Sequence, residues 1–310
     1  MIHIPVLLKE VIEVLNPEPG EFFIDGTIGS GGHAVEILKR ILPNGILLGV
    51  DWDKIAIEKA QQKISAIFPD SKLILINDNY ANLPEILKKI RKADPSIPLR
   101  ASGLLLDLGM SSDQLEHSSR GFSFLRNEPL DMRYNTKIPN SKFQIPNLTA
   151  AEVVNNFSEK DLADIFYKYG EERYSRRIAK KIIEERKKKS IKTTFDLVEI
   201  IRKAVPKLYE KGRIHFATRV FQALRIYVND ELGNLEKLLK NLAKILKPDG
   251  RAAIISFHSL EDRLVKNYFK EMAKQRKAEI LTKKPLRPTA EEIEENPRSR
   301  SAKLRAIKLI

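Results

Sequence analysis

The stretch FFIDGTIGSGGHAVEILKRILPNGILLGVD, residues 22–51, decides the fold of this chain. An apolar run at 22–24 ends at Asp25 and is followed by a glycine-rich loop and then by residues with helical spacing. A second apolar run, at 46–50, ends at Asp51, twenty residues after Gly31. This order predicts a βαβ unit with an acidic residue at the end of its second strand.

The same alternation continues up to Asp107. Helical spacing at 54–64 and 82–90 alternates with continuous apolar runs at 72–76 and 103–107. Strands that are apolar throughout are typical of parallel sheets, which are covered by helices on both faces. The first third of the chain therefore predicts an α/β domain.

The middle of the chain has a different pattern. Thr149, Ser158 and Thr193 each stand three residues before an acidic residue and precede helical periodicity, which is the pattern of a capping box. A helix at 232–246, a Pro-Asp-Gly turn at 248–250 and a strand at 252–257 then restore the α/β pattern. We expect one α/β domain over residues 1–112 and 216–310, interrupted by an all-helical domain at 113–215.

Composition limits the classes of function. There are 55 Lys and Arg residues against 41 Asp and Glu, a net charge of +14, and 42% of the residues are hydrophobic. This describes a folded basic protein with a polyanionic partner. The absence of cysteine excludes disulfides, thiolate zinc sites and cysteine nucleophiles, and the histidines show no metal-ligand spacing, so we expect no metal. No apolar run approaches the ~20 residues of a membrane span, and we expect a cytoplasmic protein without membrane contact.

The glycine loop and Asp51 indicate a nucleoside-containing cofactor. Glycines at the start of a helix let the backbone approach a ligand, and Asp51 is placed to accept hydrogen bonds from ribose hydroxyls. Nicotinamide cofactors and S-adenosylmethionine (SAM) both fit these two features. The carboxylates of Asp25 and Asp107 favour SAM, because they could face its cationic groups.

Seven long strings match one family. They are HIPVLLKEVIEVL, DGTIGSGGH, LLLDLGMSSDQLEHSSRGFSF, PLDMRYN, ATRVFQALRIYVNDEL, ISFHSLEDRLVK and NPRSRSAKLR. Over essentially its whole length the chain resembles the MraW (RsmH) family of bacterial 16S ribosomal RNA (cytosine-N4)-methyltransferases. The resemblance implies a class I, Rossmann-like SAM-dependent methyltransferase domain with an inserted all-helical domain for substrate recognition. It also implies methylation of one cytidine, position 1402, in the decoding centre of the small ribosomal subunit.

The resemblance also implies a set of cofactor contacts. They are Gly31, Gly32, His33, Asp51, Tyr80, Asp107 and Gln114. Asp51 would hold the ribose and Tyr80 would face the adenine, while Asp107 and Gln114 would lie beside the methionine part and the reacting amine. The chain lacks the Asp/Asn-Pro-Pro-aromatic string of many amine methylases, so no acceptor can be assigned from that motif. We expect direct in-line methyl transfer, with Asp107 as the leading hydrogen-bond acceptor for the amine.

Candidate RNA contacts are more widely spread. Helical spacing gathers Arg219, Gln222, Arg225 and Asn229 into one polar stripe, which with the family resemblance favours contact with RNA phosphates. Ser256 and His258 close the strand at 252–257, where they could contact the cytosine. Basic residues also cluster at 173–192, including the run 186–189, and near the C-terminus.

Two other classes of function stay open from the residues alone. One is a nicotinamide-dependent oxidoreductase, and the other is a SAM-binding RNA module without catalysis. The oligomeric state, with a homodimer as one option, is also left open.

Overall fold

The computed structural model describes residues 4–110, 118–134, 147–210 and 214–310. It divides into two compact units: residues 1–109 with 232–310, here called the α/β unit, and residues 110–231, the helical unit. The second boundary lies later than the sequence predicted. Helix α11 (Thr218–Asn229) belongs to the helical unit because it packs closely on α7 (Glu159–Gly170). A Cβ on Gly170 would lie 2.4 Å from the carbonyl oxygen of Arg219, so the two backbones nearly touch.

The α/β unit contains a seven-stranded sheet with the order β3-β2-β1-β4-β5-β7-β6. Strands β1 to β5 are parallel, and β7 runs antiparallel between β5 and β6. The strands are β1 (Phe22–Asp25), β2 (Ile46–Asp51), β3 (Lys72–Asn77), β4 (Ala101–Asp107), β5 (Leu246–Ser256), β6 (Ala278–Ile280) and β7 (Lys303–Leu309). This mixed seven-stranded sheet confirms the predicted Rossmann-like α/β fold class.

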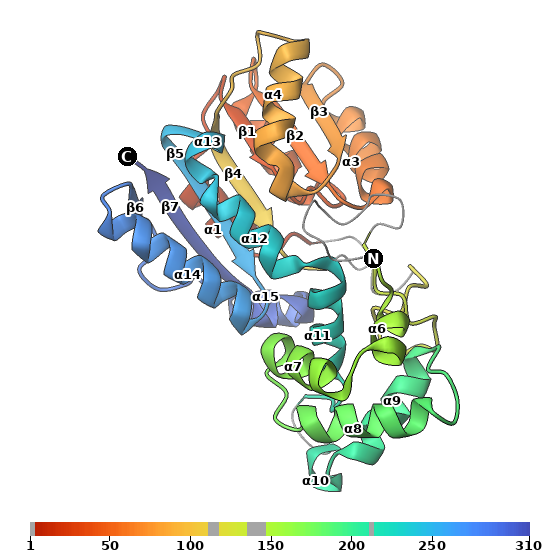
Figure 1. The fold of residues 1–310 in the computed structure, drawn as a ribbon. Coiled ribbons are helices and arrows are strands. Elements are labelled where there is room, and N and C mark those ends of the chain that lie inside the picture. The colour runs from red at the N-terminus through yellow and green to blue at the C-terminus, as the bar shows by residue number, and fades with distance from the viewer. Residues whose placement is uncertain (1–3, 111–117, 135–146, 211–213) are drawn as a thin grey trace. The chain divides into compact units, whose positions relative to one another are not determined.

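Helices cover both faces of this sheet (Figure 1). On one face lie α1 (Leu8–Leu15), α2 (Gly32–Ile41) and α3 (Lys54–Ile67). On the other lie α4 (Leu83–Ala93), α12 (Glu231–Lys240), α13 (Leu242–Ile245) and α14 (Ser259–Lys274). Strand side chains alternate between the two cores, with Phe22 and Ile24 in one and Phe23 in the other. All three are buried, which explains why the strand is apolar throughout.

The C-terminal part departs from the sequence expectation in three places. The predicted helix at 232–246 is broken into α12 and α13. The predicted turn at 248–250 lies inside β5, where Leu246 pairs with Ala101 and Arg251 with Gly103, so the residues between form a bulge. Strands β6 and β7, and α15 (Ala290–Glu295) between them, were not assigned from the sequence.

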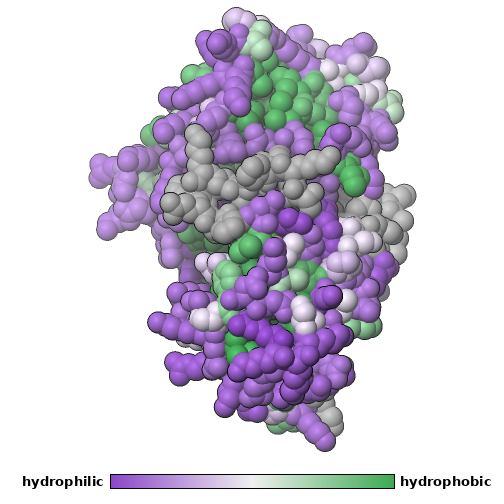
Figure 2. Space-filling model, turned by 45° about the vertical axis from the view of Figure 1, so that its right-hand side comes forward, coloured by the Kyte–Doolittle hydropathy of each residue, from purple (hydrophilic) through white to green (hydrophobic). Residues whose placement is uncertain are grey.

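The helical unit is built from α6 to α11. Besides α7 and α11 it contains α6 (Ala150–Asn156), α8 (Ser175–Arg186), α9 (Thr194–Ala204) and α10 (Lys207–Glu210). The three predicted caps are confirmed: the side chains of Thr149, Ser158 and Thr193 accept hydrogen bonds from backbone amides three residues on. Hydrophilic side chains cover most of the face of this unit that Figure 2 shows. Among the residues described, no helix has the length and apolar character to cross a membrane.

Candidate active site

The loop after β1 joins the strand to α2 by a backbone path that only glycine adopts easily. Gly29 and Gly31 have φ of 52° and 80°, both in the left-handed region. A Cβ on Gly31 would also lie 3.2 Å from the Ile64 side chain of α3. Gly31 is the N-cap of α2 and supplies no side-chain cap, so backbone N–H groups of the first helical turn are left to meet a ligand.

Asp51 ends β2 beside this loop. Its Oδ2 accepts a hydrogen bond from the Gly29 amide at 2.9 Å, and its Oδ1 accepts one from the Asp53 amide at 2.8 Å. Burial raises the pKa of Asp51 to about 6, although these hydrogen bonds oppose the shift. A carboxylate has about four acceptor positions, so the two amides leave capacity to bind hydroxyl groups. The geometry fits the predicted ribose-binding role.

Asp25 ends β1 and is sealed inside the unit, with 2% of its surface exposed. Its Oδ1 accepts a hydrogen bond from the Thr27 amide at 3.1 Å. Burial, followed by the charges of Asp107 and Asp51, raises the pKa of Asp25 to about 8. Asp25 therefore shapes the loop from inside the unit and is not exposed to a ligand.

Asp107 ends β4 at the same edge of the sheet. Its backbone amide donates to Thr27 Oγ1 at 2.7 Å, which ties the end of β4 to the glycine loop. Its Oδ1 accepts a hydrogen bond from the Gly109 amide at 3.2 Å. Sequence reasoning missed Thr27, and its place within the glycine-rich string after β1 was the available signal.

His33, the second residue of α2, faces Asp107. Its Nε2 lies 2.9 Å from the Val6 carbonyl oxygen and donates to it, so in the neutral ring Nδ1 is an acceptor. Nδ1 lies 4.0 Å from Asp107 Oδ2. The His33 ring and the Asp107 carboxylate are therefore neighbours at the carboxyl end of β4.

Tyr80 begins the short helix η1 (Tyr80–Asn82) that follows β3. It is half-buried, and a Cβ on Gly26 would lie 3.3 Å from its Cβ, so the glycine loop and Tyr80 are neighbours. The structure therefore brings six of the seven predicted cofactor residues to one edge of the α/β unit. The seventh, Gln114, lies outside the described residues.

Comparison with known proteins identifies the family. The model of the MraW methylase family matches residues 1–310. The chain belongs to the MraW methylase family. A MraW methylase uses SAM as its methyl donor, so the protein is a SAM-dependent methyltransferase and the nicotinamide and non-catalytic alternatives fall away.

Two related proteins also match this MraW methylase over nearly its whole length. A "Ribosomal RNA small subunit methyltransferase H" of Syntrophobacter fumaroxidans is 43% identical over 320 residues, covering 98% of this chain and 95% of that protein. The protein of the same name from Synechocystis is 46% identical over 303 residues, which cover 98% of this chain and 92% of that protein. Among solved structures, one described as a putative rRNA-methylase from Clostridium thermocellum matches 100% of both chains with a TM-score of 0.46 and 11% identity.

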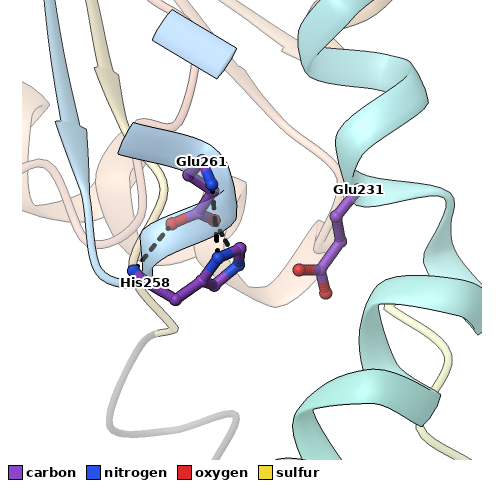
Figure 3. Close-up of side chains that lie close together, drawn as sticks. All are labelled: Glu231, His258 and Glu261. Carbon is purple, nitrogen blue, oxygen red and sulfur yellow. Dashed lines mark hydrogen bonds and ion pairs between the residues drawn. The ribbon is translucent and has the colours of Figure 1, made fainter. Parts of the chain in front are cut away.

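Ser256 and His258 lie at the end of β5 in this MraW methylase. The Ser256 hydroxyl is buried and donates to the Lys303 carbonyl at 3.3 Å. His258 caps α14: its Nδ1 accepts from the Glu261 amide at 3.3 Å, while Nε2 lies 3.2 Å from Glu261 Oε1 (Figure 3). Both side chains therefore have internal partners, and their contact with the cytosine stays a prediction.

Two members of the polar stripe on α11 have partners inside the helical unit. Asn229 is buried and hydrogen-bonds to the Met132 carbonyl at 2.7 Å and the Tyr134 amide at 2.8 Å. Arg225 forms a two-pronged ion pair with Glu231 at 2.8 and 3.0 Å. Asn229 and Arg225 therefore hold parts of the helical unit together, and their contact with RNA stays a prediction.

The other two members of the stripe are partly engaged. Gln222 Nε2 donates to the Tyr169 carbonyl at 3.1 Å. Arg219 is half-exposed and has only long contacts, 3.4 Å to the Tyr209 hydroxyl and 3.5 Å to the Glu171 carbonyl. Arg219 is thus the member of the stripe that could still reach an RNA phosphate in this MraW methylase.

Proposed function

We propose that the protein transfers the methyl group of SAM to the exocyclic N4 of one cytidine, position 1402, in 16S ribosomal RNA. The observation that carries the proposal is the Asp107 carboxylate, fixed beside His33 at the same sheet edge as Asp51, in a chain of the MraW family. The name of these relatives, ribosomal RNA small subunit methyltransferase H, supports the class of substrate.

The residues at the sheet edge fit SAM in their donor and acceptor chemistry. Asp51 has free acceptor positions for ribose hydroxyls, and Tyr80 offers an aromatic face. The space above Gly29 is open, since a Cβ there would meet no neighbour closer than 3.9 Å. When bound, SAM supplies an electrophilic methyl group on a sulfonium centre.

Asp107 is suited to act on the attacking amine. The lone pair of the cytosine amine is delocalised into the ring, so the site must hold the nitrogen in line with the methyl group and accept its hydrogen bonds as it pyramidalises. Thr27 and Gly109 fix the backbone and carboxylate of Asp107 before substrate arrives. A fixed acceptor needs no rearrangement during the reaction, and this lowers the barrier.

The RNA partner explains the positive charge of the chain. A basic protein is attracted to the phosphate backbone, and a base inside folded RNA must be held in a single-stranded loop or be flipped out to reach a catalytic residue. We place the reaction in the cytoplasm, on 16S ribosomal RNA within the small subunit.

The chemical identity of the product tests this function. The protein would be incubated with SAM and small subunits from cells that lack the methylation, and the RNA would be digested to nucleosides for mass spectrometry. We expect N4-methylcytidine, and none when SAM is omitted. Formation of 5-methylcytidine, or of no methylated cytidine, would contradict the proposal.

A further inference from the structure

One surface of the helical unit gathers exposed positive charge. At the start of α8 and just before it, four cations are exposed: Arg173, Arg176, Arg177 and Lys180. Between them Ser175, Ile178 and Ala179 are buried, so the cations share the outer side of the helix. We call these four residues the arginine face.

Two tyrosines support this face. The guanidinium carbon of Arg173 lies 4.8 Å from the ring centroids of both Tyr174 and Tyr209, and that of Arg177 lies 5.7 Å from Tyr174. The two rings contact each other edge to face at 5.0 Å. Stacking on a ring orients a guanidinium while its N–H groups stay available at the edge.

A buried carboxylate holds the two tyrosines. Glu172 has no exposed surface, and its Oε2 accepts from the Tyr209 hydroxyl at 2.7 Å while its Oε1 accepts from the Tyr174 amide at 2.8 Å. Burial, followed by the hydrogen bond to Glu172, raises the pKa of Tyr209 to about 12, so Tyr209 stays a neutral donor. The platform beneath the arginines is therefore built into the fold.

Several cations from the middle of α8 onward form ion pairs. Lys181 pairs with Glu184 at 3.0 Å, Lys188 with Glu185 at 3.0 Å, and Lys189 with Asp196 at 3.2 Å. Within the described part of the chain, no acidic group lies within ion-pair distance of Arg173, Arg176 or Arg177. The three arginines at the beginning of the segment therefore form a cluster of cations without an ion pair, and Lys187 and Lys192, nearer its end, are exposed and have no ion pair among the described contacts.

Arg186 begins the basic run that the sequence analysis favoured for RNA binding. Its Nη1 donates to the carbonyl oxygens of Val154 and Phe157 at 2.9 and 2.7 Å. Arg186 therefore satisfies the last carbonyls of α6, as cationic side chains often do at helix C-termini. Arg186 thus has a structural role, two lysines of the run are paired and Lys187 is exposed, so RNA binding by the run stays a prediction.

We propose that the arginine face binds the phosphate backbone of the RNA substrate. This inference rests on the proposed function, and it names the surface of the helical unit that docks the substrate. Guanidinium groups match phosphate oxygens in a two-pronged geometry, and unpaired ones offer that geometry without first breaking an ion pair. The half-exposed tyrosine rings add flat surface for unstacked bases.

Two triple variants of the full-length protein with the same loss of charge test the surface. R173Q/R176Q/R177Q removes three cations of the arginine face, and K181Q/K188Q/K189Q removes three paired cations of the same segment. Affinity for the small-subunit ribosomal RNA would be measured across a salt series, together with affinity for SAM. We expect the first variant to lower the slope of log affinity against log salt by roughly 2 to 3, at 0.7 to 0.9 per lost phosphate contact. The control slope should change far less, and SAM affinity should not change in either variant.

A second pair of variants tests the same surface if R173Q/R176Q/R177Q does not fold. R176Q/K180Q removes cations for which the described contacts include no aromatic ring, and K188Q/K189Q is its control. Equal losses of RNA affinity in test and control variants would overturn the proposal, as would an unchanged salt slope in R176Q/K180Q. Failure of the proposed function would look different, because the unmodified protein would then not methylate the RNA at all.

Discussion

The carboxylates that end β1, β2 and β4 have different surroundings, although all three lie at one edge of the sheet. Asp25 is sealed from solvent and hydrogen-bonded to its own loop. Asp51 is held by two backbone amides and keeps free acceptor positions. Asp107 faces the acceptor atom of His33. These surroundings support our proposal that Asp25 shapes the loop, Asp51 binds the cofactor and Asp107 acts on the reacting amine.

Asp107→Asn tests whether Asp107 acts on the reacting amine while Asp51 binds the cofactor. The amide keeps one acceptor oxygen but loses the negative charge that favours a polarised amine, so we expect the methylation rate to fall by about 10²- to 10⁴-fold. SAM affinity, measured by calorimetry, should change much less. Asp51→Asn is the comparison, and it should lose SAM affinity instead. If Asp107→Asn lost rate and SAM affinity equally, Asp107 would be only a cofactor ligand.

Asp25 predicts a pH dependence of stability. Its pKa is raised by burial to about 8, against about 4 in an unfolded chain, so between these values the folded state holds a proton that the unfolded state has released. The free energy of unfolding should therefore decrease as the pH rises from about 4 to about 8. Asp25→Asn keeps an acceptor for the Thr27 amide and should remove up to roughly 1.4 kcal/mol per pH unit of this slope. Urea unfolding at about pH 5 and about pH 8 measures it, and a slope unchanged by the substitution would contradict the assignment.

Among the helices and strands, the sequence predicted those that are marked by residues close together in the chain. The parallel strands were recognised because both of their faces are buried, and α6, α7 and α9 because their capping residues mark where each begins. Strand β7 was missed because its alternation of polar and apolar residues is interrupted at Ala306 and Ile307, and because the segment was interpreted through its charge. Two of its cations, Lys303 and Arg305, instead pair with Asp262.

Helix α11 shows what a periodic pattern cannot settle. Spacing predicts which side chains share a side of the helix, but not whether a polar side faces solvent or a neighbouring backbone. Asn229 lies against the segment 132–134, about a hundred residues earlier in the chain, and no local signal announces this contact. The caps could be predicted because both partners lie within one turn, whereas this contact is long-range.

Asn229→Ala tests the structural role of α11. The Tyr134 amide and the Met132 carbonyl would lose their partners in a buried place, which should lower the free energy of unfolding by about 2 to 3 kcal/mol. Asn156→Ala, at the exposed end of α6, is the matched control and should change stability by less than about 0.5 kcal/mol. Urea titration of both variants measures this. Equal stability of the two variants would contradict the structural role of Asn229.

At the scale of the whole molecule, the charged residues behind the net charge of +14 are unevenly distributed and differ in their partners. The cofactor edge is lined by carboxylates, and several cations elsewhere are consumed by ion pairs or by helix ends. Each ion pair takes up one cation and one carboxylate, so pairing leaves the net charge unchanged but determines which cations carry the surplus. A partner bound through such charge is released by salt, whereas a cofactor held in a small polar site is affected less.

Salt should therefore separate the two binding events. We expect affinity for small-subunit ribosomal RNA to fall linearly on a log-log plot between about 50 and 200 mM salt, with a slope of about −0.7 to −0.9 for each phosphate contacted. SAM affinity should vary little over the same range. Titrations of both ligands in the same buffers measure the difference, and an RNA affinity insensitive to salt would exclude phosphate docking.

The most direct test of the central claim is to map where the methyl group goes. Small subunits that lack the modification would be incubated with the protein and isotopically labelled SAM, and the 16S ribosomal RNA would be cut into fragments for mass spectrometry. We predict label on N4 of a single cytidine, position 1402 in the decoding centre, and almost none with Asp107→Asn. Label at another nucleotide, at several nucleotides or at none would contradict the account.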